Sequence, residues 1–275
     1  MAENILECIE SRIYYREAMG CEIWNQNLDI VWGARSLDQK PKYKRVVLKL
    51  SGEALGGESG RGFDIDVIRD VCQAVKACSD LGVQTAVVVG GGNFWRGAKD
   101  ANFERARSDQ IGMLSTVMNS LALSDVLESM GADVRVQTAI EMKAVAEPYM
   151  RLQAIRHLER GRIVIFGCGT GHPYFTTDTA AVLRAAEIGA EAILLAKNID
   201  GVYNDDPAQN PDAVKYDTIS FGQVLQDRLG VMDLTATSMA MESNIPVVVF
   251  ALEDPQNILR AVRGEAIGTL ISGKD

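Results

Sequence analysis

The sequence predicts an α/β fold in which a mainly parallel sheet carries helices on both faces. Three observations predict it: short apolar runs of strand length, longer segments of helical periodicity between them, and glycine clusters directly after several of the apolar runs. Strands that alternate with helices favour parallel pairing, and the intervening helices then cover both faces. Ligands of such sheets bind beyond the carboxyl ends of the strands, where these glycines fall.

The first half of the predicted domain alternates strands and helices. An apolar run ends at Ser51-Gly52, and a second run ends at three glycines that begin with Gly90. Between the two runs, apolar residues recur at spacings of three and four after Asp64, which suits a helix with an aspartate N-cap. The predicted elements are strands at 45–50, 84–89 and 133–136 and helices at 65–78 and 109–130.

The second half continues the same alternation with shorter connections. A strand is expected to end in the glycine-rich stretch that begins at Gly167, and the next helix is expected to begin near Asp178. The predicted elements are helices at 151–159, 178–188, 220–228 and 234–243, strands at 162–166, 192–196 and 246–250, and a short last strand at 270–271.

Composition and charge exclude several classes of protein. A hydrophobic fraction of 47% over 275 residues supports a sizeable core. The net charge of −9 disfavours nucleic acids and anionic membranes as partners. No apolar run approaches the ~18 residues of a membrane span, and the acidic N-terminus lacks the apolar core of a secretory signal.

The cysteine pattern indicates a reducing compartment. An odd number without a C-x-x-C pair disfavours a disulfide scaffold and a zinc ribbon, so we predict a cytoplasmic protein. Cys72 and Cys78 follow a helical apolar pattern and are interpreted as small buried hydrophobes. The five cysteines are Cys8, Cys21, Cys72, Cys78 and Cys168.

The first 42 residues differ from the remainder. Trp24 and Trp32 stand among charges without a clear period, and Pro41 ends the segment. We therefore predict an N-terminal extension at 1–42, whose order the sequence leaves open, and one domain at 43–275.

Two glycine-containing motifs suit phosphate binding. In Lys49-Leu50-Ser51-Gly52, an ammonium, a hydroxyl and an unobstructed backbone N–H follow the first strand. In residues 90–97, consecutive glycines allow close approach to a polyanion, and Arg96 offers a planar fork. The alternatives are a solvated lysine beside a turn and a flexible loop. Neither motif matches a P-loop or a dinucleotide fingerprint.

Two later motifs also carry chemistry. In residues 169–178, two threonine hydroxyls precede a helix, and Asp178 suits either an anion site or a helix-start acid. His172 suits a turn, and His157 is interpreted as structural. In residues 197–207, Tyr203 could stack on a base and Asp206 could bind a ribose or an adenine edge. The alternative there is a solvated hairpin at Asp200-Gly201.

Taken in order, these four motifs resemble the amino acid kinase superfamily and, within it, the bacterial UMP kinases, also called uridylate kinases. The similarity runs from about Tyr43 to Ser272 and includes residues 111–119, 231–233 and 264–270, where no chemistry is obvious. The resemblance implies a three-layer αβα sandwich with a mainly parallel central sheet, usually assembled as a homohexamer. It departs at His172, where asparagine is more usual, and this departure bears on UMP affinity.

The resemblance implies an enzyme that phosphorylates UMP to UDP with ATP in pyrimidine nucleotide biosynthesis. Mg²⁺ would accompany ATP without a direct protein ligand, GTP would activate and UTP would inhibit. Phosphoryl transfer needs positioned phosphates and neutralised charge, and the UMP phosphate is already anionic, so no general base is required.

The resemblance also assigns roles by position. It assigns catalysis to Lys49, Arg96 and Asp178. It assigns ATP binding to Lys49, Leu50, Ser51, Gly52, Gly92, Arg96, Asn198, Tyr203 and Asp206, with Lys197 as an alternative contact. It assigns UMP binding to Gly91, Asp109, Thr170, Gly171, His172, Pro173, Tyr174, Phe175, Thr176 and Thr177. It links GTP to Gly57, Glu58, Ser59, Gly60, Arg61 and Gly62.

Two rival interpretations stay open at this point. One is another amino acid kinase with a carboxylate or carbamate acceptor. Asp109 and the threonine-rich stretch up to Asp178 favour a nucleotide acceptor instead. The other is a non-catalytic relative that binds nucleotides or oxyanions, against which the presence of Lys49, Arg96 and Asp178 counts.

Overall fold

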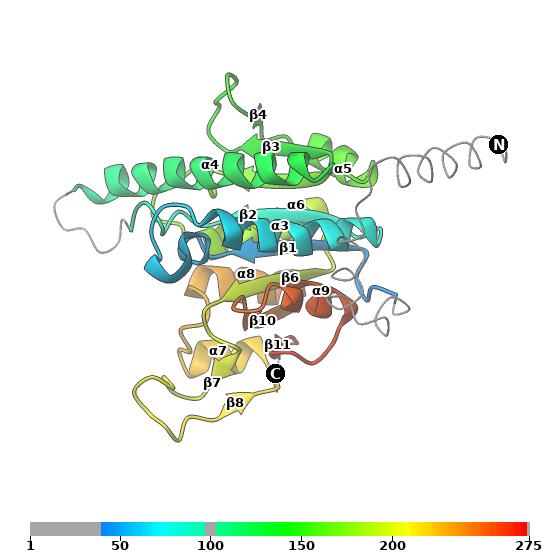
Figure 1. Cartoon of the computed structure of the whole chain (residues 1–275). Helices are drawn as coiled ribbons and strands as arrows, with labels where there is room; N and C mark the ends of the chain where they lie inside the picture. Colours follow the sequence, from blue (N-terminus) through cyan, green and yellow to red (C-terminus); the bar gives the residue numbers. More distant parts are fainter. Residues whose placement is uncertain (1–39, 97–102, 274–275) are drawn as a thin grey trace. The chain divides into compact units, whose positions relative to one another are not determined.

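The computed structural model describes residues 40–96 and 103–273 (Figure 1). The described residues from Pro41 onward belong to one compact unit. Of the predicted extension, 1–42, only the last three residues lie within the described part. Lys42 already joins the domain, since its backbone N–H donates to the carbonyl of Val262 at 3.0 Å.

Within the described residues, the central sheet has nine strands in the order β4-β3-β5-β2-β1-β6-β10-β11-β9. Every pairing is parallel except that of β10 with β11. A separate antiparallel pair joins β7 to β8. The strands are β1 (Arg45–Leu50), β2 (Gln84–Val89), β3 (Val134–Thr138), β4 (Glu147–Pro148), β5 (Ile163–Gly167), β6 (Ala192–Lys197), β7 (Val202–Tyr203), β8 (Lys215–Tyr216), β9 (Thr218–Ile219), β10 (Val247–Ala251) and β11 (Thr269–Ile271).

Helices cover both faces of this sheet (Figure 1). Alternate residues of β1 divide between two cores: Leu48 and Leu50 face one, and Val47 faces the other. The first face carries α3 (Ile65–Asp80), α4 (Arg105–Ser129) and α9 (Gln256–Arg263). The second face carries α5 (Arg151–Glu159), α6 (Thr177–Ile188), α7 (Phe221–Gln226) and α8 (Leu234–Ser243).

The predicted elements are confirmed, with small shifts at their ends. Asp64 caps α3, as expected. The long helix begins at Arg105 instead of 109, because the Glu104 carboxylate accepts the N–H groups of Ala106 and Arg107 at 3.0 Å each. The hairpin expected at Asp200-Gly201 is wrong: these residues precede β7, and the β7–β8 connection is the longer segment 204–214.

Burial of the described cysteines agrees with their interpretation as small hydrophobes. Cys72, Cys78 and Cys168 are free and buried. Burial raises the pKa of the Cys72 and Cys78 thiols to about 12, so both stay protonated near neutral pH. None of the described helices is long and apolar enough to cross a membrane.

The chain changes direction across the sheet at β1. Strands β2 to β5 all lie on one side of β1, in the order β2, β5, β3 and β4 away from it, and α6 then connects β5 to β6 on the other side of β1. A crevice opens at such a switch point, beyond the carboxyl ends of the strands. Lys49 is the last residue but one of β1, Gly90 directly follows β2, and Lys197 is the last residue of β6.

A pair of buried asparagines holds the glycine-rich loop after β2. Asn93 and Asn119 exchange side-chain hydrogen bonds at 3.0 and 2.8 Å. Asn119 also donates to the carbonyl of Gly90 at 2.6 Å, and Asn93 donates to that of Gly62 at 2.7 Å. The pair therefore ties α4 to the glycine loop and to the turn before α3.

We expect Asn119→Ala to lower the free energy of unfolding by about 1–3 kcal/mol, because it leaves the buried Gly90 carbonyl and the Asn93 amide without this partner. Urea unfolding would measure the loss. Ser124→Ala, a polar truncation on the same helix, should stay within about 0.5 kcal/mol of the parent. Equal effects of the two changes would contradict a special role for the pair.

Candidate functional site

A carboxylate shared by two lysines lies at the switch point. The Nζ of Lys49, near the end of β1, is 2.7 Å from Oδ1 of Asp178. The Nζ of Lys197, the last residue of β6, is 3.1 Å from Oδ2 of the same carboxylate. The three side chains are largely buried, with exposed fractions of 10% for Lys49, 13% for Asp178 and 20% for Lys197. Taken by themselves, these three side chains carry one net positive charge, and their two ammonium groups suit an anionic ligand.

The electrostatics of the three residues are coupled. Burial alone would raise the pKa of Asp178, but the charges of Lys49 and Lys197 outweigh it and hold that pKa below its usual range. Burial lowers the pKa of Lys197, and Asp178 offsets only part of this effect because Lys49 repels the same ammonium. Asp178 is therefore ionised at neutral pH.

The start of α6 places Asp178 in this cluster. Thr176 is the N-cap: its hydroxyl accepts the N–H groups of Asp178 at 3.1 Å and Thr179 at 3.2 Å. Asp178 lies in the first turn but is not the cap, and its side chain is taken up by the two lysines. The sequence suggested that Asp178 is either a helix-start acid or part of an anion site. Asp178 does lie at the start of a helix, and the dipole of that helix also favours a bound anion.

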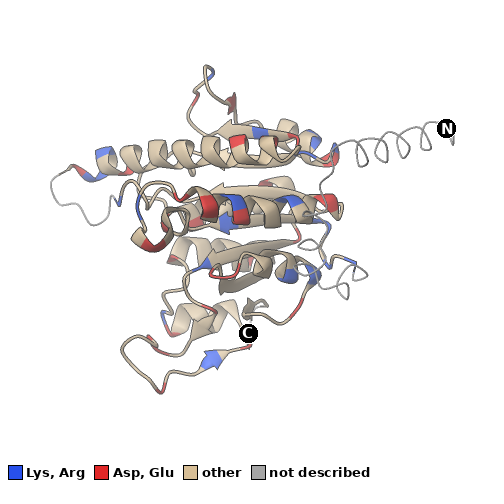
Figure 2. Ribbon diagram, in the orientation of Figure 1, with Lys and Arg blue, Asp and Glu red and all other residues tan. Residues whose placement is uncertain are grey.

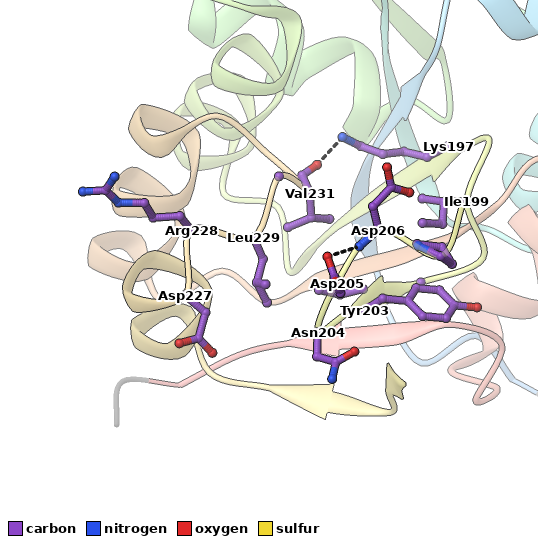
Figure 3. A pocket seen from close by; sticks show the side chains of 14 residues that line it. Lys197, Ile199, Tyr203, Asn204, Asp205, Asp206, Asp227, Arg228, Leu229 and Val231 are labelled. Atoms are coloured by element: carbon purple, nitrogen blue, oxygen red, sulfur yellow. Dashed lines mark hydrogen bonds between the residues drawn. The ribbon is translucent and has the colours of Figure 1, made fainter. Parts of the chain in front are cut away.

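One pocket, of about 460 Å³, lies beyond the end of β6 (Figure 3). We call it the donor pocket, after the ATP contacts that the resemblance assigns to its residues. It contains the predicted residues Tyr203 and Asp206 together with Lys197, whereas Asn198 is exposed and does not line it. Further lining comes from Ile199, Gly201, Val202, Asn204, Asp205, Pro207, Asp227, Arg228, Leu229, Gly230 and Val231.

Both predicted adenosine contacts in this pocket are already held by neighbours. The hydroxyl of Tyr203 donates to Asp200 at 2.8 Å, and Lys215 pairs with the same carboxylate at 2.9 Å. The hydrogen bond to Asp200 raises the pKa of the Tyr203 phenol. The carboxylate of Asp206 accepts from Ala208 and Gln209 within its own turn, at 3.0 and 2.9 Å. The ring of Tyr203 is thereby oriented before any base stacks on it.

A second pocket, of about 360 Å³, lies between the glycine loop, α4 and the segment before α6. We call it the acceptor pocket, after the UMP contacts that the resemblance assigns to its residues. Of the residues assigned to UMP, it contains Gly91, Asp109, Thr170, His172, Phe175, Thr176 and Thr177. Gly171, Pro173 and Tyr174 do not line it. Residues that were not predicted also line it: Glu53, Trp95, Ser108, Gly112, Met113, Thr116 and Gly169.

Asp109, on α4, holds the loop that precedes α6 beside the acceptor pocket. Its Oδ2 accepts the backbone N–H of Tyr174 at 2.8 Å and pairs with Arg105 at 2.9 Å. The Arg105 guanidinium lies 5.7 Å from the centre of the Tyr174 ring. Tyr174 has a φ of 72°, a left-handed conformation that is uncommon outside glycine. The loop is therefore held at Asp109 itself, the residue assigned to the UMP ribose.

The residues assigned to the ATP phosphates lie in different surroundings. Arg96, which the resemblance assigns to ATP, lines the acceptor pocket, and its guanidinium pairs with Glu53. The side chain of Leu50 is fully buried in the core. A Cβ on Gly52 would lie 2.5 Å from the Gly90 carbonyl oxygen, so glycine is needed for close backbone approach. Neither pocket is lined by Ser51 or Gly92.

The segment 57–62 lies at the end of η1 (Glu53–Ser59) and in the turn that follows. Gly57 has a φ of +57°, and a Cβ there would lie 2.2 Å from Oδ2 of Asp64. The backbone N–H of Gly62 donates to the Asn93 carbonyl at 3.1 Å. The segment thus contacts the glycine loop that lines the acceptor pocket.

Among the described residues, no group of three or more His, Cys, Asp or Glu side chains could hold a metal ion. Both oxygens of the Asp178 carboxylate face ammonium groups. This arrangement fits Mg²⁺ that is carried by nucleotide phosphates and water, because Mg²⁺ usually keeps several waters and binds few protein ligands.

Residues 44–251 match the amino acid kinase family, and the chain belongs to that family. Its similarity to solved structures is more specific. A UMP kinase from Bacillus anthracis is 42% identical with a TM-score of 0.82, over 85% of this chain and 97% of that one. A UMP kinase from Ureaplasma parvum is 35% identical with a TM-score of 0.79, over 84% and 99%. A uridylate kinase from Archaeoglobus fulgidus is 33% identical with a TM-score of 0.65, over 82% and 99%. The predicted α/β sandwich is confirmed.

We expect Asp178→Asn to lower the free energy of unfolding at neutral pH by about 3 kcal/mol or more, because it removes the carboxylate that two buried ammonium groups share. The deficit should shrink as pH rises toward the usual lysine value of 10.5, since the folded variant then holds fewer protons than the unfolded chain. Denaturant titrations across this range would measure it.

Asp80→Asn is a matched control for the loss of one carboxylate. Asp80 pairs with Lys76 on the exposed side of α3 at 2.7 Å. Its loss should have a small, salt-dependent effect without the recovery at high pH. A pH-independent deficit in Asp178→Asn would contradict the proposed coupling with Lys197.

Proposed function

We propose that this protein is a UMP kinase, which transfers the γ-phosphoryl group of ATP to UMP and forms UDP and ADP. The observation that carries the proposal is the Lys49–Asp178–Lys197 cluster between two pockets. Lys197 lines the donor pocket, and Thr177, the neighbour of Asp178, lines the acceptor pocket. The similarity to UMP kinases and a uridylate kinase at 33–42% identity supports UMP as the acceptor.

In this proposal the chain acts by positioning and charge. ATP occupies the donor pocket, with its base against Tyr203 and its phosphates toward Lys49 and Lys197. The two ammonium groups neutralise charge that spreads over the transferred group, and Asp178 keeps them in place. The start of α6 holds the UMP phosphate near Thr177. A UMP phosphate oxygen attacks the γ-phosphorus as the bond to the ADP oxygen breaks, so no proton has to be removed.

Mg²⁺ that accompanies ATP would neutralise further charge during the transfer. Arg96 would serve the acceptor side after leaving Glu53, because both residues line that pocket. Asp109 would accept hydrogen bonds from the UMP ribose with its Oδ1, since Oδ2 already holds the loop at Tyr174.

The test is ADP release with ATP and Mg²⁺, comparing UMP with CMP, AMP, dTMP, aspartate and acetylglutamate. Turnover with UMP and little with the others supports the proposal. Robust turnover of a carboxylate would move the protein to another branch of the amino acid kinases. Tight nucleotide binding without any turnover would favour a non-catalytic relative.

In the same assay, Lys49→Ala should lower kcat by about 100-fold or more, the scale of losing one key charge in the transition state. Lys76→Ala is the matched control, because Lys76 lies on α3 in an exposed pair with Asp80. A kcat of Lys49→Ala within about threefold of the parent would remove Lys49 from the mechanism.

The homohexamer is also part of the proposal, and an apolar stripe on α4 supports self-association. Leu114, Met118 and Leu121 follow helical spacing and are 47%, 46% and 37% exposed. No charged residue occurs from Gln110 to Ser124, and the middle of α4 is correspondingly tan in Figure 2, without blue or red. An exposed apolar stripe of this kind marks an interaction surface.

Leu114→Glu should therefore reduce the mass measured by multi-angle light scattering, because a charge would be buried in the interface. Leu152→Glu is the control, since Leu152 is 59% exposed on α5, outside the stripe. An unchanged mass for Leu114→Glu would show that subunits meet elsewhere or not at all.

Regulation by GTP and UTP completes the proposal. The contact of Gly62 with Asn93 supports a route from the segment 57–62 to the acceptor pocket. The ADP-release assay with added GTP or UTP tests each effector separately.

A further inference from the structure

Asp233 lies where the two sides of the site meet, and nothing in the proposed function uses it. It belongs to Val231-Met232-Asp233, a stretch with no obvious chemistry in the sequence. Its carboxylate accepts the hydroxyl of Thr176 and that of Thr179, the latter at 2.9 and 3.0 Å. It also caps α8 by accepting the N–H of Ala236 at 2.9 Å.

A helix cap alone does not account for these contacts. Capping α8 needs the one hydrogen bond to Ala236. The other hydrogen bonds come from α6, on either side of Asp178: Thr176 is the N-cap of α6, and Thr179 is buried one residue beyond Asp178. Asp233 thus holds the first turn of α6, which carries Asp178, in place.

The same short stretch also reaches the donor pocket. The ammonium of Lys197 donates to the carbonyl of Val231, which lines that pocket beside it (Figure 3). Thr176, held by Asp233, lines the acceptor pocket. Residues 231–233 therefore contact a lysine of the donor side and the threonine that begins the acceptor-side helix.

We propose that Asp233 is a positioning residue for phosphoryl transfer, which fixes the start of α6 and with it Asp178 against Lys197. The inference rests on the proposed function. A displacement of about 1 Å in a reacting constellation can cost on the order of 100-fold in rate, so a residue that sets this spacing matters without touching substrate. Its charge matters as well. The charged groups around the Lys197 ammonium are Lys49 on β1, Asp178 on α6 and Asp233 before α8.

The main test is Asp233→Asn in the ADP-release assay. We expect kcat to fall about 10-fold or more, while KM for ATP and for UMP changes less than about threefold. We also expect the alkaline limb of the pH–kcat profile to move to lower pH, because one negative charge beside Lys197 is lost. Asp254→Asn, which removes an exposed carboxylate at the start of α9, should change neither. An unchanged kcat and alkaline limb in Asp233→Asn would overturn the inference.

A double-mutant cycle separates positioning from an independent effect. If Asp233 acts through Asp178, the double variant Asp178→Asn/Asp233→Asn should be within about threefold of Asp178→Asn alone. Multiplied losses would overturn the inference. If Asp233→Asn does not fold, Thr179→Val removes one hydroxyl donor and keeps the charge. It should lower kcat severalfold without moving the alkaline limb, and a parental kcat would overturn the inference.

Failure of the proposed function looks different, because the parent protein would not turn over UMP at all. Titration of Lys197 by NMR with labelled lysine then tests the inference without catalysis. Asp233→Asn should lower the pKa of Lys197, and Asp254→Asn should not. Identical titrations of Lys197 in the parent and in Asp233→Asn would overturn the inference.

Discussion

The arrangement of the site depends on one buried carboxylate that two lysines share. Removing three charges from water is costly, and the arrangement is stable only if each charge has its partner. The sheet register meets this condition: Lys49 pairs with Leu195 on β6, so the two lysines leave neighbouring strands close together. A slip by one residue would turn one lysine to the opposite face of the sheet. The capped start of α6 then supplies the carboxylate between them.

The two pockets come from different parts of the chain. Residues 53–177 supply the lining of the acceptor pocket, and residues 197–231 supply that of the donor pocket. The chain passes from one to the other through α6 and β6, which begin and end at the shared cluster. Two substrates can therefore be held by separate surfaces while their phosphates meet at one point. Residues 231–233 also contact both surfaces, because Val231 accepts a hydrogen bond from Lys197 and Asp233 accepts one from Thr176.

Much of this arrangement could be predicted from the sequence, because it follows from local patterns of apolar, glycine and charged residues. Apolar runs and glycines located the main strands, the motifs that follow them singled out Lys49 and Asp178, and the resemblance assigned catalysis to both. Lys197 was assigned only as an alternative contact, since its place beside Lys49 depends on β6 lying next to β1. Asp233 was missed because its partners on α6 are 54 and 57 residues away. Two-residue strands such as β7 and β8 are too short to show a period.

The reciprocal asparagine pair has a consequence for the history of this protein. Each of Asn93 and Asn119 provides the donor and the acceptor that the other needs, inside a region closed to water. A change at either position alone leaves the remaining amide without its partner, at a cost comparable to a large part of a domain's net stability. Related sequences should therefore keep both residues or exchange both together. Covariation at two sites 26 residues apart would record a constraint that neither site shows by itself.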